Sequence, residues 1–484
     1  MHTRIHWRRW WPRLLFLAAL TLYLCTLAPT ISWGDSARLQ RQAYQLDLSA
    51  NHPFYHPLWV ALAHPFTRLP LGDVAWRVNL FTALCAALTA PLVYGALAAV
   101  APSPLARLAG CGALLVSHCF WMHAARAEVY SLNLLLYSFC LWCLLAGKLA
   151  PWRAVAAGLA AGVAVSHHAM LWAAVPGFAI LLIARLRGQP RCWAWGALAA
   201  AAFLAPVVAY RLVFRQPLGA SLNPLDYVPT LATLRREVPR LAAYVILQLP
   251  SPALALAVVG ARRAWRQPAL GAATALTCLL GVVAALNLAY SDKYVFYGLS
   301  FFILALWVAP GWEAAAARLA QRMPRPAQLL LTLLLASLVI VPPVAYAALP
   351  RLLPAVGVTA RTLGIREVPE RPALAFFFTP WRRGDDGARR FAAAALTALP
   401  ENAVLLADAT IGQPLLYLQQ VEGVRPDVRV SDQAPAKQVA YARRVSPAET
   451  VYLAHTDALY DVQGLSAHFR LVPEGPVVRL ELPR

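Results

Sequence analysis

Charged residues are scarce in this chain of 484 residues, and acidic residues are the scarcest. Only 13% of the residues are charged, about half of the share in a soluble domain, while 60% are hydrophobic. Lysine and arginine number 43 against 22 aspartate and glutamate residues. The arginines alternate with apolar segments instead of lining one soluble face, which argues against nucleic-acid binding. The composition therefore predicts a polytopic α-helical membrane protein in a lipid bilayer.

The chain also lacks a disulfide framework, internal repeats and a clear signal-peptide cleavage site. Its eight cysteines all lie in or beside apolar segments, so they do not indicate a disulfide scaffold. The internal repeats that mark many transporters are not visible. The N-terminus has the basic and apolar regions of a signal peptide without a convincing cleavage site, so we expect an uncleaved first membrane helix.

Eleven apolar stretches are candidates for membrane spans, which need about 20 residues each. If the N-terminus is cytoplasmic, the short arginine-rich connections, such as those containing Arg107, Arg187 and Arg263, all fall on the cytoplasmic side. With about 11 spans, the C-terminal region is then on the outer face. The stretches lie near residues 12–30, 74–100, 105–122, 129–147, 153–168, 169–185, 192–213, 241–260, 269–289, 294–313 and 327–349.

The pattern of the sequence changes after residue 350, where short strands and helices alternate. The segment ARRFAAAALTALP predicts a helix, AVLLAD a buried strand, PLLYLQQVEG a helix, and DVRVSD, ETVYLAH and VVRLEL further strands. We therefore expect a multi-span domain at 1–350 and a small extracytoplasmic α/β domain at 351–484. This region offers no catalytic cluster, and Asp408, at the end of a predicted strand, is its best polar candidate.

The first outer loop, residues 31–73, is long and rich in acids, amides, histidines and aromatics. Its second half is too proline-broken for a span and amphipathic enough to lie in the membrane interface, with its aromatics at headgroup depth. Its acid Asp35 directly follows a span, where an aspartate is either a helix cap or a solvated acid, or else a general base.

Asp35 shares the predicted outer face with Glu128 and Arg126, which lie at another outer boundary. Taken singly, Glu128 is typical of a surface ion-pair partner. Together, two carboxylates and several cations at one membrane face suit attack on a phosphate-linked substrate. The reaction needs a base for the nucleophile and positive charge for the phosphate. Asp35 and Glu128 are therefore the candidate catalytic residues.

Further polar residues on the same face are candidates for substrate binding. Each also has a structural interpretation: a lysine beside a helix often anchors it at the interface, paired histidines can be structural, and polar groups at the start of a span often bond neighbouring helices. No third clear ligand accompanies the histidines, so we assign no metal site. The candidates are Lys293, Asp292, His52, His56, His167, His168, Arg77 and Asn79.

An ordered set of motifs resembles the membrane family of protein O-mannosyltransferase-like proteins, over about residues 20–150 and 290–430. That family is similar in layout to the GT-C glycosyltransferases, which use a lipid-phosphate sugar donor and an acidic residue in the first outer loop. Where members commonly have Asp-Ser-Gly-Glu, this chain has Asp35 to Arg38, so the Asp carries over and the Glu does not. A Gly turn of the family is also replaced at His52 to Leu58. The motifs are GDSARLQRQAY, HPFYHPL, PLGDVAWRVNLFTAL, RAEVYSLNLLL, LPENAVLLAD and YLQQVEGVRPDVRV.

The resemblance implies an inverting hexosyltransferase that moves a mannose-like sugar from a polyprenyl-phosphate donor to an acceptor hydroxyl on a protein, lipid or glycan. Its place would be the cell inner membrane, as a multi-pass protein with a periplasmic C-terminal domain. No cofactor is implied, and a need for a divalent cation is left open. Two alternatives stay open at this point: a transporter or flippase of lipid-linked substrates, and a non-catalytic membrane assembly partner.

Overall fold

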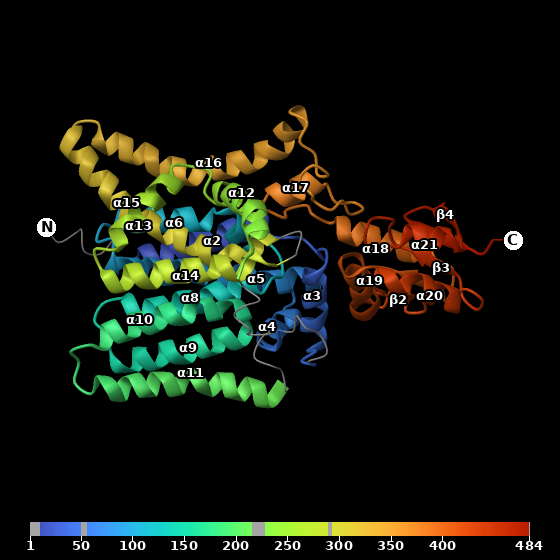
Figure 1. Cartoon of the computed structure of the whole chain (residues 1–484), viewed down its shortest axis with the longest axis horizontal. Helices are drawn as coiled ribbons and strands as arrows, with labels where there is room; N and C mark the ends of the chain where they lie inside the picture. The colour runs from blue at the N-terminus through green and yellow to red at the C-terminus, as the bar shows by residue number, and fades with distance from the viewer. Residues whose placement is uncertain (1–9, 50–55, 215–227, 289–292, 484) are drawn as a thin grey trace.

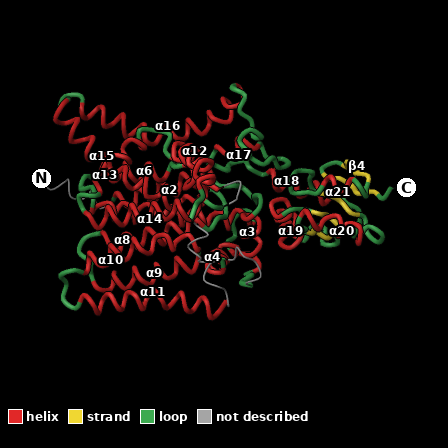
Figure 2. Tube along the Cα trace, viewed as in Figure 1, coloured by secondary structure: helices red, strands yellow, loops and turns green. Residues whose placement is uncertain are grey.

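The computed structural model describes residues 10–49, 56–214, 228–288 and 293–483 as a helical bundle followed by a small α/β region (Figure 1). Strands occur only in the α/β region among the residues that are described (Figure 2). The prediction of a mostly helical chain with a small C-terminal sheet is confirmed. The bundle helices are α2 (Trp11–Thr26), α5 (Val74–Ala96), α6 (Pro104–Leu115), α7 (His118–Ala124), α8 (Tyr130–Leu145), α9 (Pro151–His167), α10 (Val175–Leu186), α11 (Cys192–Phe214), α12 (Leu231–Gln248), α13 (Ala253–Ala264), α14 (Pro268–Leu286), α15 (Gly298–Arg322) and α16 (Ala327–Ala355), with 3-10 turns η2 (Leu97–Ala99), η3 (Ala169–Ala174) and η5 (Lys293–Tyr297).

Each of the eleven predicted spans overlaps helix, but those at 105–122 and 241–260 each cross the bend between two helices, and fewer than eleven of the described helices are long and apolar enough for a span. Within the described ranges, six helical stretches are long and apolar enough to cross a membrane, and up to eight if each of two bent pairs is one span. The bent pairs are α6 with α7, at 66°, and α12 with α13, at 106°. Helices α2 and α8 are apolar but have only 16 residues each. The number of eleven spans therefore stays a prediction.

Small residues allow neighbouring bundle helices to approach closely. A side chain at Gly260 in α13 would meet the backbone oxygen of Trp307 in α15 at 1.7 Å, and one at Gly311 in α15 would meet that of Leu256 at 1.9 Å. Such contacts between small residues are typical of helices packed in a membrane, where close backbone approach replaces the hydrophobic effect.

The basic connections gather at one end of the bundle. The side chain of Arg185 bonds the backbone oxygen of Gly147, which joins the connections before α9 and after α10. Gln267 similarly donates to the oxygen of Ala99 at 2.7 Å and joins the connections before α6 and α14. The α/β region lies at the opposite end, where the N–H of Arg382 donates to the oxygen of Thr26 at the end of α2 (Figure 1).

The first outer loop is folded against the bundle, and it contains three short helices: α3 (Asp35–Gln45), α4 (Pro57–Ala63) and η1 (His64–Arg68). Trp59 is fully buried in a core shared with Val78 and Phe81 of α5, and its indole N–H donates to the oxygen of Glu128 at 3.1 Å. Trp59 therefore packs inside the protein, where α5 and α8 cover it, and the depth of the loop's aromatics in the membrane stays a prediction.

The α/β region holds a five-stranded sheet of order β2-β1-β3-β5-β4, in which β2, β1 and β3 are parallel and β5 runs antiparallel to β3 and β4. Helices α18 and α19 pack on one face, while α20 and α21 pack on the other. Ile31 and Trp33 of the first loop join the core beneath α18 and α19, which seats the sheet on the bundle. The elements are α17 (Ala373–Phe378), α18 (Gly387–Ala398), β1 (Val404–Leu406), α19 (Ala409–Glu422), β2 (Arg429–Ser431), α20 (Pro435–Val445), β3 (Val451–Leu453), α21 (Val462–Ser466), β4 (Arg470–Glu474) and β5 (Val477–Glu481).

Candidate active site

A cavity of about 440 Å³ lies where the bundle, the first loop and the α/β region meet. Its walls come from the start of α3, the end of α7, the start of α8, the junction of α9 with η3, the turn η5, α17 with the segment before it, and the start of α19. Among the predicted site residues, it brings together Asp35, His56, Arg126, Glu128 and His168. The other lining residues are Trp33, Gly34, Arg38, Leu39, His123, Val129, Tyr130, Tyr294, Val295, Phe296, Ile365, Arg366, Arg371, Phe376, Phe377, Ala409 and Thr410.

Asp35 is the first residue of α3 and faces the cavity with an exposed side chain. Gly34 has a φ of 62°, which favours glycine, and its N–H donates to the oxygen of Thr410 at 3.0 Å. This turn starts α3 against the α/β region. The Asp35 carboxylate is 61% exposed and lies 3.1 Å from the guanidinium of Arg38, one turn later. A carboxylate in the first turn also complements the helix dipole.

Glu128 also pairs with an arginine, but it is buried, in contrast to the exposed Asp35. Its Oε1 lies 2.9 Å from Nη2 of Arg126, both side chains are 10% exposed, and the hydroxyl of Ser36 donates to the same oxygen at 3.4 Å. Glu128 is thus an ion-pair partner in this structure, although the pair is buried and not at the surface as expected. Because both residues also line the cavity, the pair presents a cation and an acid to any bound substrate.

Asn79 holds the backbone at Ala127, between Arg126 and Glu128, through hydrogen bonds. This is the structural role that the sequence also allowed for it. Its side-chain oxygen accepts the N–H of Ala127 at 2.8 Å and the amide of Gln40 at 2.8 Å, and its own amide donates to Ala28 at 3.1 Å. Arg77 donates to backbone oxygens of Thr67, Gly72 and Asp73. Neither side chain lines the cavity. Both hold the first loop on α5.

Three arginines surround the ring of Phe376 in α17. The guanidinium carbons of Arg126, Arg371 and Arg382 lie 5.4, 4.6 and 4.1 Å from the ring centre. Burial, with the charges of Arg126 and Arg366, lowers the pKa of Arg371 to about 10. Crowded, partly desolvated cations of this kind favour an anionic ligand. Sequence reasoning missed Arg371 and Phe376, although the basic and aromatic run RPALAFFF was a readable signal.

The histidines form a cluster of three. The rings of His56 and His168 are stacked, with centres 5.4 Å apart, and the ring of His167 lies edge-on to His56 at 5.4 Å. His167 is buried outside the cavity lining. In the part of the chain that the structure describes, no group of three or more metal-binding side chains is arranged to hold an ion. His52 and Asp292 lie outside the described residues.

Aromatic side chains form a second wall, which sequence reasoning did not identify. Tyr130 lies at its centre, with ring centres 4.3 Å from His123, 5.5 Å from His168 and 6.3 Å from Phe296. His123 is 2% exposed, and neither of its ring nitrogens has a hydrogen-bond partner among the described residues. A ligand group can therefore bond to it at little cost.

Lys293 lies outside this lining, although its neighbours Tyr294 and Val295 belong to it. Its Nζ lies 3.1 Å from the buried carboxylate of Glu237 in α12 and donates to the oxygen of Leu286 at 3.0 Å. Lys293 therefore joins α12 to η5 in this structure.

The comparisons with known proteins agree with this layout. Residues 35–191 match the family model described as the Protein O-mannosyl-transferase TMEM260 N-terminal domain. Protein O-mannosyl-transferase TMEM260 of Mus musculus is 32% identical over 120 residues, which are 25% of this chain and only 17% of the mouse protein. The resemblance read from the sequence is confirmed over this stretch, while the later motifs at 290–430 lie beyond the matched residues.

A solved structure extends the likeness to the whole fold. The crystal structure of ArnT from Cupriavidus metallidurans bound to undecaprenyl phosphate matches with a TM-score of 0.57, covering 98% of this chain and 99% of that one. At 15% sequence identity, this match shows the fold alone. The chain is thus a multi-pass membrane protein with a GT-C-like fold.

Proposed function

We propose that this protein is a membrane glycosyltransferase that moves a hexose, mannose-like, from a polyprenyl-phosphate donor to an acceptor hydroxyl. The observation that carries the proposal is the single cavity in which the exposed carboxylate of Asp35 meets the arginines Arg126 and Arg371. Two comparisons support it: the matched family model is named for O-mannosyl transfer, and the structural neighbour was solved with a polyprenyl phosphate.

The donor phosphate would bind at Arg126 and Arg371, whose guanidinium groups both lie near the ring of Phe376. Transfer breaks the bond between the anomeric carbon and a phosphate oxygen, and the electron pair leaves with the polyprenyl phosphate. Arginines that already lie there stabilise the negative charge as it develops, without reorganisation. The salt bridge from Glu128 keeps Arg126 turned toward this place. Glu128 is then a positioning residue for Arg126.

Asp35 is the general base of the proposed reaction. It accepts the proton of the acceptor hydroxyl while the oxygen bonds to the anomeric carbon from the face opposite the phosphate, so the configuration inverts. Its exposure of 61%, against 10% for Glu128, leaves its carboxylate accessible to an acceptor from outside. Glu128, which lines the same cavity, is the second candidate for this role.

The aromatic wall is the proposed sugar subsite. Rings of Tyr130, His168 and Phe296 offer apolar faces to a hexose, and the buried His123 offers ring nitrogens to a sugar hydroxyl. The walls contributed by α3 and the α/β region would shield the reacting carbon from water, which otherwise competes as acceptor.

The proposed orientation places this cavity outside the cytoplasm, at the cell inner membrane, because the basic connections gather at the opposite end of the bundle. A protein, lipid or glycan hydroxyl in the periplasm would then be the acceptor. For the flippase alternative, ionisable groups would be expected along a path through the bundle. Here the proposed site groups meet at one end of it.

Transfer of label tests the proposal. Purified full-length protein in nanodiscs is incubated with radiolabelled polyprenyl-phosphate hexoses and a periplasmic extract, and label in protein, lipid and glycan fractions is counted. We expect label to move with one hexose and to need Asp35. The matched control is Asp47→Asn, at a half-buried acid just after the same helix. The Asp47 carboxylate accepts hydrogen bonds from the N–H and the hydroxyl of Ser49 and does not line the cavity. In proteoliposomes, labelled donor that crosses the bilayer without bond transfer would instead establish the flippase.

A further inference from the structure

The α/β region has a crevice of the kind in which open α/β sheets bind their ligands. Strand β1 has β2 on one side and the parallel strand β3 on the other, so the order in which strands join the sheet reverses between β1 and β3. Ligands of such folds bind outside the carboxyl ends of the two strands at this switch point. In this protein Asp408 follows β1, and His455 and Asp457 follow β3, all at that edge.

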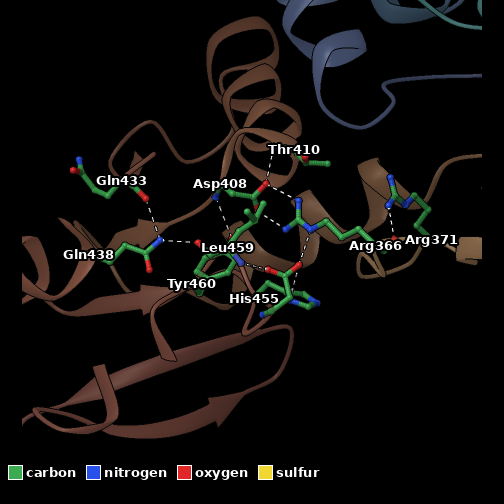
Figure 3. A network of polar contacts seen from close by, with 10 residues as sticks. Arg366, Arg371, Asp408, Thr410, Gln433, Gln438, His455, Leu459 and Tyr460 are labelled. Carbon is green, nitrogen blue, oxygen red and sulfur yellow. Dashed lines mark hydrogen bonds and ion pairs between the residues drawn. The ribbon is translucent and has the colours of Figure 1, made fainter. Parts of the chain in front are cut away.

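The side chain of Arg366 fills this crevice (Figure 3). Its two terminal nitrogens each lie 2.8 Å from an oxygen of Asp408, and its Nε lies 2.6 Å from Asp457. The hydroxyl of Tyr460 completes the set, because it donates to Asp408 at 3.0 Å. Burial opposes the charge on Arg366, but its hydrogen bonds to Asp408 and Asp457 raise its pKa above the ordinary value. The crevice therefore holds a guanidinium of this same chain.

Arg366 belongs to a segment that also builds the cavity. We call residues 365–377 the strap, which runs from the segment after α16 into α17. Four of its residues that line the cavity are Ile365, Arg366, Arg371 and Phe376. Within the strap, Nη2 of Arg371 donates to the backbone oxygen of Arg366 at 2.8 Å (Figure 3). Arg366, which the α/β region binds through Asp408 and Asp457, is thus linked by one hydrogen bond to Arg371 at the cavity.

We infer that the α/β region binds the strap as its own ligand and that Arg366 is a positioning residue, which sets Arg371 in the donor-phosphate subsite. The inference rests on the proposed function for the identity of the anion, a polyprenyl phosphate. A fork of two charge-assisted bonds orients Arg366 more rigidly than a point charge would. Asp408 and Asp457 hold Arg366, Arg366 holds Arg371 through its backbone oxygen, and Arg371 meets the phosphate.

A double-mutant cycle tests this order of action. Binding of undecaprenyl phosphate to the full-length protein in nanodiscs is measured for Arg366→Gln, Arg371→Gln and the double variant. Each single variant should weaken binding about tenfold, the scale at which misplaced groups lose their effect. The double variant should bind like Arg371→Gln alone, because Arg366 acts through Arg371. Multiplying effects would overturn the inference.

A second measurement does not depend on the ligand. Hydrogen–deuterium exchange of residues 365–379 should accelerate several-fold in Arg366→Gln, while exchange in β1 and α19 stays slow and shows that the α/β region is still folded. The matched control is Glu449→Gln, which removes the surface ion pair with Arg429, at 2.7 Å, in the same region. Exchange in the strap that is unchanged by Arg366→Gln would overturn the inference.

The two measurements separate the two proposals. If the unmodified protein does not bind undecaprenyl phosphate, the proposed donor is wrong, and exchange alone then decides whether Arg366 holds the strap. If it binds and the double variant loses the product of the two single effects, the donor stands and the positioning role of Arg366 fails.

Discussion

Arg126 and Glu128 form an ion pair of 2.9 Å at the cavity, with both side chains 10% exposed. Asp35 also has an arginine partner, since its carboxylate lies 3.1 Å from Arg38, but its side chain is 61% exposed and faces the cavity. This difference in exposure is the reason why we assign the base to Asp35 and the positioning role to Glu128 in the proposed mechanism.

Asp35→Asn keeps the size of the side chain and removes the proton acceptor. We expect kcat to fall by about 10²–10⁴-fold, the usual contribution of a general base, with donor binding retained. Glu128→Gln should instead mainly raise the Kd for the donor, because Arg126 loses its orientation. Both variants are compared in one label-transfer assay. An inactive Glu128→Gln beside a fully active Asp35→Asn would assign the base to Glu128.

Arg371→Gln should weaken binding of polyprenyl phosphate about tenfold and reduce kcat/KM with it, since the arginine would meet both the bound phosphate and the developing charge. Titration of the lipid phosphate against the purified variant measures the change. Arg361→Gln is the control, because Arg361 is an exposed arginine of the same linker that lies outside the cavity lining. Equal effects of the two variants would contradict a phosphate subsite at Arg371.

Lys293→Met should destabilise the fold, because it leaves the Glu237 carboxylate, 2% exposed, without its buried partner and with only the exposed Arg236 and Arg240, at 2.7 and 3.2 Å, to balance its charge. Breaking a buried ion pair on one side costs about 3–5 kcal/mol, while replacing both members by apolar residues is often neutral. The thermal midpoint of Lys293→Met should therefore drop, and that of Lys293→Met with Glu237→Leu should recover. A normal midpoint together with lost donor binding would contradict this prediction. Lys293 would then be a substrate-binding residue, as the sequence suggested.

Acid should loosen the hold of the α/β region on the strap. Burial raises the pKa of Asp408, but the hydrogen bonds and charge of Arg366 outweigh it and hold this pKa below its ordinary value. The stabilisation is therefore complete above the unfolded pKa of about 4 and is lost as the pH falls through the folded value. Exchange in residues 365–379 should rise at acid pH, and Asp408→Asn should flatten this dependence. His455, Asp457 and Tyr460 face the same cluster, so Asp457→Asn is measured beside it.

The orientation in the membrane is tested by reporter fusions. Fusions after Ala150 and Pro190 should report the cytoplasm, while fusions after Leu71 and near Glu370 should report the outer side, because the basic connections mark the cytoplasmic face. A cytoplasmic signal near Glu370 would place the cavity on the other side of the membrane and remove the proposed periplasmic acceptors.

Hydrophobic periodicity predicted the elements whose sequences carry a clear apolar pattern. Each apolar stretch overlaps helix, and β1, β2, β3 and β5 lie within the segments predicted for them, while α18 and α19 begin one and five residues before theirs. Helix α20 and strand β4 were not predicted. Gln438 and Ala442 are the buried residues of α20, and β4 is Arg470–Glu474, so neither carries a strong apolar pattern. Tertiary packing makes these two elements, since a short polar segment has little preference of its own.

The sequence by itself determined a multi-span helical protein with a small C-terminal sheet, and it brought Asp35, Arg126 and Glu128 to notice through their places beside apolar runs. Only the tertiary structure decided the partners. Lys293 meets Glu237, 56 residues away, and Arg371 approaches Arg126 from a segment more than 200 residues later. A local pattern records whether a residue lies in a span or at its end, because burial follows hydrophobicity. Which charged groups share a cavity depends on how segments that are distant in the sequence pack together. A local sequence pattern carries no information on that packing.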